Sequence, residues 1–252
     1  DVCSSDLTPL ISVNNERVIP HMNNPIRLTN SCECSSRGCE SGCLSGSGHM
    51  GMNRGSAHHA VQMRTAFMSA HPLHYLTVLH GEMEEFGHLA ESKGFRPVFR
   101  LNGTTDIRYH KLPTAPILFG RNAQFNEYTK YNTRKALSAS ALQEEAQRKR
   151  DFPNLFIIHS MHEGTTTPRL QQIVSEGENF AVPVHISEKD PVFADHQTPT
   201  IPNIGFMHHG VMYPTINGYR MDMRFLDPKI GGAVVLPVRT LTGSGAKEHN
   251  VI

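Results

Sequence analysis

The stretch Leu155-Phe-Ile-Ile-His-Ser-Met161 decides the fold class of this chain. It is a nearly continuous apolar run, the pattern of a strand buried on both faces of a sheet. Residues 168–176 then have the pattern of a short helix that Gly177 ends, and residues 180–186 form the next strand-like run. A strand, a helix and a strand in this order predict a parallel sheet with covering helices.

The same alternation extends outward from this stretch. We expect helices over 50–70, 72–93 and 135–151, and strands over 97–101, 124–129, 219–225 and 233–238. Beyond Asp190, prolines at 191, 199, 202 and 214 predict a loop-like region. The predicted fold is α/β, a partial (β/α) barrel-like parallel sheet with a Cys-rich loop near the N-terminus.

Several of the predicted strands end in polar residues. In barrels and open α/β sheets alike, chemistry gathers at the carboxyl ends of the strands. We therefore expect substrate contacts or catalysis there, and binding residues beside them. The predicted catalytic residues are Asn102, Asp106, His162 and Glu163, and the predicted binding residues are Lys130, His185 and Glu188. A plain turn at 102–106 and a helix cap at 165–167 are the alternatives.

Four cysteines lie within one Gly- and Ser-rich loop, residues 31–48, with the spacing C-x-C-x4-C-x3-C. A loop with so little apolar material needs a covalent or coordinative tie to hold one shape. We predict that it binds an iron–sulfur cluster or a metal ion, with zinc as the alternative. Structural zinc sites usually contain C-x2-C pairs, which this spacing lacks. The remaining alternatives for these cysteines are free thiols and disulfides. The predicted ligands are Cys32, Cys34, Cys39 and Cys43.

The 252 residues have a net charge of +1, and the apolar runs are too short to span a membrane. This charge does not indicate nucleic acid as a partner, and the substrate expected is a small molecule or a macromolecule of unknown identity. Phosphate-loop and nucleophile-elbow motifs are missing, which disfavours an ATPase or a serine hydrolase. Cysteines clustered in this way favour a reducing, cytoplasmic compartment.

Residues 1–7, DVCSSDL, look like the translation of a common sequencing adapter, so we expect them, Cys3 included, to be an artefact. Residues 8–30 are then an N-terminal segment whose true start is missing. We predict a single α/β domain over 31–239 and a flexible tail over 240–252.

Four motifs in a fixed order resemble the phage gene product 88 family. They are Cys32-x6-Cys39-x3-Cys43, Arg100-Leu-Asn-Gly-Thr-Thr-Asp-Ile107, Phe125-Asn-Glu-Tyr-Thr-Lys130 and Met221-Asp-Met-Arg-Phe-Leu-Asp227. The resemblance covers 29–239 and implies a bacteriophage or prophage protein, without assigning it a biochemical function. Two departures from the family pattern, an extra Cys34 and Leu44 in place of an aromatic residue, leave open which cysteines bind.

The layout also resembles, more distantly, radical S-adenosylmethionine enzymes, in which three cysteines bind a four-iron cluster and leave one iron open for S-adenosylmethionine. The usual C-x3-C-x2-C spacing of those enzymes is not reproduced here. Two functions are therefore expected: a radical-type enzyme with an iron–sulfur centre, or a non-enzymatic binding protein with a structural zinc ion.

Overall fold

The computed structural model describes residues 4–6, 17–19, 26–28, 56–103, 105–184, 200–218 and 222–237. Its helices are α3 (Ser56–Ala70), α4 (Pro72–Ser92), α5 (Ala115–Phe119), α6 (Ala139–Asp151) and α7 (Thr167–Ser175), with short 3-10 turns η2 (Tyr109–Lys111) and η3 (Arg224–Leu226). Its strands are β1 (Ser4–Asp6), β2 (Arg17–Ile19), β3 (Ile26–Leu28), β4 (Val98–Arg100), β5 (Gln124–Thr129), β6 (Leu155–Ser160), β7 (Phe180–Val184), β8 (Thr200–His208), β9 (Val211–Asn217) and β10 (Ala233–Pro237).

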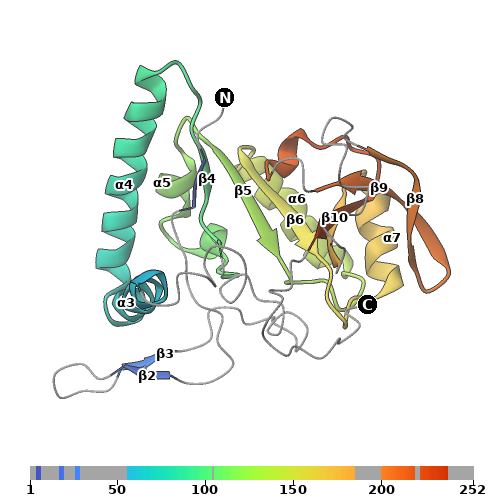
Figure 1. The fold of residues 1–252 in the computed structure, drawn as a ribbon, viewed down its shortest axis with the longest axis horizontal. Helices are drawn as coiled ribbons and strands as arrows, with labels where there is room; N and C mark the ends of the chain where they lie inside the picture. The colour runs from blue at the N-terminus through green and yellow to red at the C-terminus, as the bar shows by residue number, and fades with distance from the viewer. Residues whose placement is uncertain are drawn as a thin grey trace. The chain divides into compact units, whose positions relative to one another are not determined.

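The predicted α/β class, a parallel sheet with helices around it, is confirmed (Figure 1). The main sheet has the strand order β1-β4-β5-β6-β7-β10-β9-β8, which is an open order with two edges. The pairs β1–β4, β4–β5, β6–β7, β7–β10 and β10–β9 are parallel, and β8–β9 is antiparallel. Strands β2 and β3 pair in a separate antiparallel ribbon.

The chain groups into two compact units, and the boundary between them passes through β5, α6 and β6. In unit 1 (1–35, 43–127 and 147–156), aromatic rings join helices to strands. Phe86 of α4 meets Phe99 of β4 at 5.7 Å between ring centroids, and Phe119 of α5 meets Phe125 of β5 at 4.7 Å. Figure 1 shows α4 as the long helix of this unit.

In unit 2 (36–42, 128–146 and 157–252), one apolar cluster joins α7 to the strands. Leu170 and Ile173 of α7 pack with Phe180 and Val182 of β7 and with Tyr213 of β9. The apolar side chains of α7 therefore face the strands.

Most of the predicted helices and strands are confirmed, because each has a strong local signal. Helix α4 ends where Gly94 adopts a φ of 75°, a conformation that glycine tolerates best. Within the described ranges, no helix has the length and apolar character needed to cross a membrane.

Two predictions for the region after Asp190 are wrong, whereas the strand predicted over 233–238 is confirmed as β10. The hairpin β8–β9 replaces part of the predicted loop, and residues 224–226 of the strand predicted over 219–225 form η3, while 219–221 lie outside the described ranges. The hairpin turns through His209 and Gly210, both at positive φ, as tight hairpin turns require. The prolines in this region led to the prediction of a loop. Pro202 is compatible with β8 because β8 is an edge strand and its pairing is irregular between Thr200 and Gly205.

Residues 4–6, in the segment that we predicted to be an adapter artefact, pair with β4 as strand β1. The origin of these residues and the bounds of the single domain and its tail stay predictions.

A fully buried arginine connects three elements of unit 2. The Nη2 of Arg169, on α7, lies 3.0 and 3.2 Å from the two carboxylate oxygens of Glu145 on α6. The same nitrogen is 3.2 Å from Nε2 of His159 on β6. Burial raises the pKa of Glu145, but His159 and Arg169 together outweigh it and lower that pKa to about 2.

Arg169 also anchors the loop between β5 and α6. Its Nε donates to the backbone oxygen of Asn132 at 2.8 Å, and Asn132 has a positive φ of 60°. Farther along, the side chain of Gln172 accepts from the backbone N–H of Leu137 at 2.8 Å and donates to its backbone oxygen at 3.2 Å. Hydrogen bonds from α7 therefore hold both ends of the β5–α6 loop.

Replacing Arg169 by methionine should lower the free energy of unfolding by about 3–5 kcal/mol, because Glu145 loses the arginine that contacts both of its carboxylate oxygens. Urea denaturation measures this change. The matched control is Arg150→Met, since Arg150 is exposed on α6 and donates only to Gln147 among its described contacts; it should change stability by less than about 0.5 kcal/mol. Equal effects of the two substitutions would contradict a structural role for Arg169.

Candidate functional site

The predicted site residues divide among three parts of the chain. Asn102 and Asp106 lie in unit 1, and Lys130, His162 and Glu163 lie in unit 2, so each group is considered by itself. The remaining predicted residues lie outside the described ranges: Cys32, Cys34, Cys39, Cys43, His185 and Glu188. Their roles stay predictions.

In unit 1, Asn102 closes the loop that follows β4. Its amide nitrogen donates to the backbone oxygen of Ile107 at 2.8 Å, and its amide oxygen accepts from the backbone N–H of Ile107 at 2.9 Å. The hydroxyl of Thr105 donates to the same amide oxygen at 2.6 Å. Asn102, Thr105 and Asp106 are all buried. The side chain of Asn102 therefore holds the loop in shape, as the turn alternative predicted.

Glu127, which the sequence analysis did not select, holds the start of this loop. One carboxylate oxygen accepts from the backbone N–H of Leu101 at 2.7 Å, and the other accepts from that of Asn102 at 3.0 Å. Because residues two apart on a strand share a face, Glu127 points the same way as the core residue Phe125. The sequence signal that indicates Glu127 is a carboxylate at a position that the strand pattern places on the buried face.

Burial raises the pKa of Glu127 to about 7, even though the two N–H groups and nearby Arg100 favour the charged form. The carboxyl group therefore changes its protonation near neutral pH while it holds the end of a strand. Such a group combines structural and acid–base character, and it is the strongest titratable candidate in unit 1.

In unit 2, His162 follows β6 and is 3% exposed. Its Nδ1 accepts from the backbone N–H of Gly164 at 2.9 Å, so the proton of the neutral ring resides on Nε2. Burial is the main cause that lowers the pKa of His162; Arg134 and Lys130 lower it further, and Glu163 opposes them. Its backbone N–H donates to the hydroxyl of Thr165 at 3.0 Å. This imidazole is a neutral hydrogen-bond donor at pH 7.

The segment 222–227 contains a buried ion pair. Arg224 is 1% exposed and lies 3.2 Å from a carboxylate oxygen of Asp227. Burial raises the pKa of Asp227 to about 6, while Arg224 opposes the shift and Asp222 adds to it. Asp222 accepts from the hydroxyl of Tyr128 at 2.7 Å. Arg224 and Asp227 therefore form a structural ion pair.

In the part of the chain that the structure describes, there is no group of three or more His, Cys, Asp or Glu side chains placed to hold a metal ion. The cysteine loop is outside that part, so the predicted centre is neither supported nor opposed by this observation.

Replacing Glu127 by glutamine should lower the free energy of unfolding by about 1–3 kcal/mol. The amide NH2 of glutamine is a donor, so one backbone N–H loses the acceptor that the carboxylate oxygen provided. The raised pKa also gives a pH signature. The stability that the protonated carboxyl contributes is complete below pH 4.5 and is lost as the pH rises through about 7. The variant should lose this decline, as urea denaturation between pH 4.5 and 7.5 would show.

The control is Glu84→Gln, because Glu84 is 64% exposed and lies 3.6 Å from Arg121. It should keep the pH profile of the original protein. If Glu127→Gln kept that profile as well, Glu127 would not be the group that titrates.

His162 should be neutral at pH 7, with its proton on Nε2. The nitrogen chemical shifts of ¹⁵N-labelled histidine report both the charge and the tautomer. A charged ring, or a proton on Nδ1, would contradict the hydrogen bond from Gly164.

Comparison with known proteins supports the family resemblance. The chain matches no curated protein and no solved structure. The sequence model of the family described as "Gene product 88" matches residues 8–248, which is nearly the whole chain. The protein belongs to the gene product 88 family.

Proposed function

We propose that this gene product 88 protein binds an iron–sulfur cluster or a metal ion through its cysteine loop and acts as an enzyme. Its mechanism would be of the radical type if one iron of a cluster has no protein ligand. The observation that carries the proposal is four thiols within twelve positions, at 32, 34, 39 and 43. Thiolates are soft ligands that favour iron–sulfur clusters and zinc. An open iron would also give S-adenosylmethionine a place to bind.

In this proposal, each unit has its own candidate substrate contacts, at the carboxyl ends of its parallel strands. Asp106 follows β4, and His162 and Glu163 follow β6. Each of these strands is part of the parallel sheet, where ligands of α/β proteins commonly bind. His162 would donate a hydrogen bond to the substrate, and Lys130, His185 and Glu188 would assist binding. Asn102 would act by holding the loop that carries Asp106.

A non-enzymatic binding protein with a structural zinc ion is the second candidate. Four thiolates are enough to fill the four positions of a structural zinc site. The hydrogen bonds of the Asn102 side chain favour this candidate, because they give a predicted catalytic residue a structural task.

The setting that we propose is the cytoplasm of a bacterial host, where reduced thiols are available to bind metal. The net charge of +1 gives no general attraction to nucleic acid. A small-molecule or macromolecular substrate therefore remains the proposed partner.

Anaerobic purification followed by metal analysis and a visible spectrum tests the proposal. Several irons per chain and a brown colour support the enzyme, and one zinc without colour supports the binding protein. The double substitution of Cys39 and Cys43 by alanine should remove the metal in either case. The double substitution of Ser36 and Ser41 by alanine is the matched control, since it changes two residues of the same loop without removing a thiol and should leave the metal content unchanged. A full chain without metal would overturn both functions.

A further inference from the structure

We propose that the turn between β6 and α7 binds an oxyanion group, specifically a phosphate group, with His162 and Thr166 as hydrogen-bond donors and Lys130 and Arg134 as the cations beside them. The following observations all lie within unit 2.

Two polar atoms at this turn are buried and have no hydrogen-bond partner among the described residues. They are Nε2 of His162 and the hydroxyl oxygen of Thr166. Because Nδ1 of His162 accepts from Gly164, its Nε2 carries a proton and is a donor. A buried donor without a partner is costly, and a bound ligand is one of the ways in which proteins satisfy it.

Thr166 is the N-cap residue of α7, a nine-residue helix. An N-cap threonine ordinarily accepts a hydrogen bond from a backbone N–H of the first turn, but the Thr166 side chain makes no such bond. Its buried hydroxyl therefore has no hydrogen-bond partner among the described residues and belongs to the N-terminal end of α7, where the helix dipole stabilises anions.

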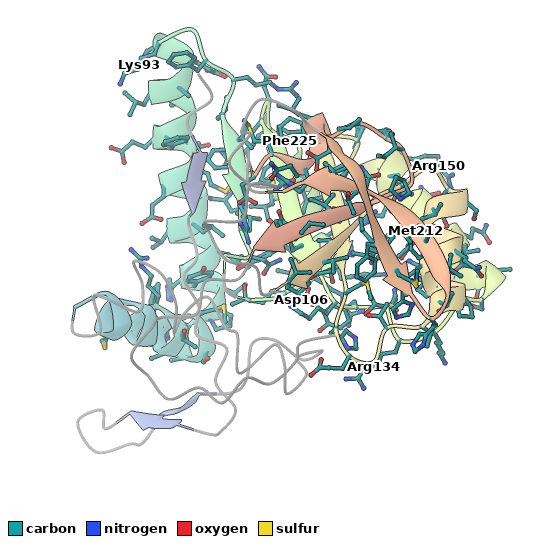
Figure 2. The ribbon with its side chains drawn as sticks, turned by 45° about the vertical axis from the view of Figure 1, so that its right-hand side comes forward. Lys93, Asp106, Arg134, Arg150, Met212 and Phe225 are labelled. Carbon is teal, nitrogen blue, oxygen red and sulfur yellow. The ribbon has the colours of Figure 1, made fainter. Side chains whose placement is uncertain are left out.

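Arg134 borders the same space as His162. A Cβ added to Gly164 would lie 2.9 Å from Cε1 of His162 and 3.7 Å from Cγ of Arg134. The imidazole of His162 and the stem of Arg134 therefore both lie beside Gly164. Figure 2 labels Arg134, which is exposed, so a ligand from solvent can reach its side chain.

The formal charges near His162 favour a negatively charged ligand. Arg134 and Lys130 act electrostatically on His162, and Glu163 acts in the opposite sense. Two cations and one carboxylate leave a net charge of +1, to which the helix dipole adds. A phosphate group, with several acceptor oxygens, can accept from His162, Thr166 and a cation at once.

The loop that carries the two cations is held in place before any ligand binds. Asn132 accepts from Arg169, and the backbone oxygen of Thr133 accepts from the backbone N–H of Thr166 at 3.4 Å. The Thr133 hydroxyl donates to the backbone oxygen of Lys130 at 2.8 Å. A site fixed in this way loses little entropy on binding.

The inference rests on the proposed placement of a substrate site near His162, and it does not depend on the cysteine centre. It narrows the substrate class to molecules that carry a phosphate group. If the full chain contains no metal but still binds phosphate at this turn, the metal proposal fails and the present one stands.

The test is a titration of the full chain with inorganic phosphate at constant ionic strength, followed by the backbone amide NMR signals of Gly164 and Thr166. We expect saturable shifts and weaker binding of acetate. Thr166→Val, which removes the hydroxyl and keeps the side-chain shape, and Arg134→Gln should each raise the Kd for phosphate about tenfold. Arg150→Gln removes another exposed arginine and should leave the Kd unchanged.

Three results would overturn the proposal. They are shifts that do not saturate, a Kd that neither Thr166→Val nor Arg134→Gln raises, and an equal loss of affinity in Arg150→Gln. Acetate that binds as tightly as phosphate would overturn the assignment of a phosphate group. The amide spectrum of each variant also reports whether it is folded, so a loss of binding can be separated from a loss of structure.

Discussion

The described structure depends on two buried charged side chains that satisfy backbone groups where parallel strands end. Glu127 accepts from the first two backbone N–H groups after β4, and Arg169 donates to the loop after β5. Backbone groups that leave a sheet inside a protein need new partners. In each unit a buried ionisable side chain helps to meet this need, and both groups would be expensive to bury if they made no such contacts.

This arrangement has a consequence for function. Residues at the carboxyl ends of strands are the ones that α/β proteins use for binding, and here their backbone is fixed before a ligand arrives. At His162 and Thr166, two buried polar atoms have no hydrogen-bond partner among the residues that the structure describes. Around Asn102, by contrast, the polar atoms already bind one another. The turn between β6 and α7 is therefore better prepared for a ligand than the loop after β4.

Sequence patterns predicted the parts of the fold that have strong local signals. The apolar run of β6, the helix α7 and the strand β10 were all expected, since their burial follows from a few adjacent residues. The β8–β9 hairpin was missed because prolines in both strands suppress the strand pattern, although tertiary pairing tolerates them. Glu127 and Arg169 were missed for a related reason. Their partners Leu101, Asn132 and Glu145 lie 24 to 37 residues away, and spacing along the chain does not reveal such contacts.

Hydrogen exchange of individual backbone amides is the most direct test of the central claim, that a buried charge holds the strand-end loops rigid. The amides of Leu101 and Asn102 donate to Glu127, and that of Ile107 donates to Asn102. If the claim is correct, these three amides exchange as slowly as those within the core strand β5, because they open only when the unit unfolds. Exchange at the rate of an unstructured loop would contradict it.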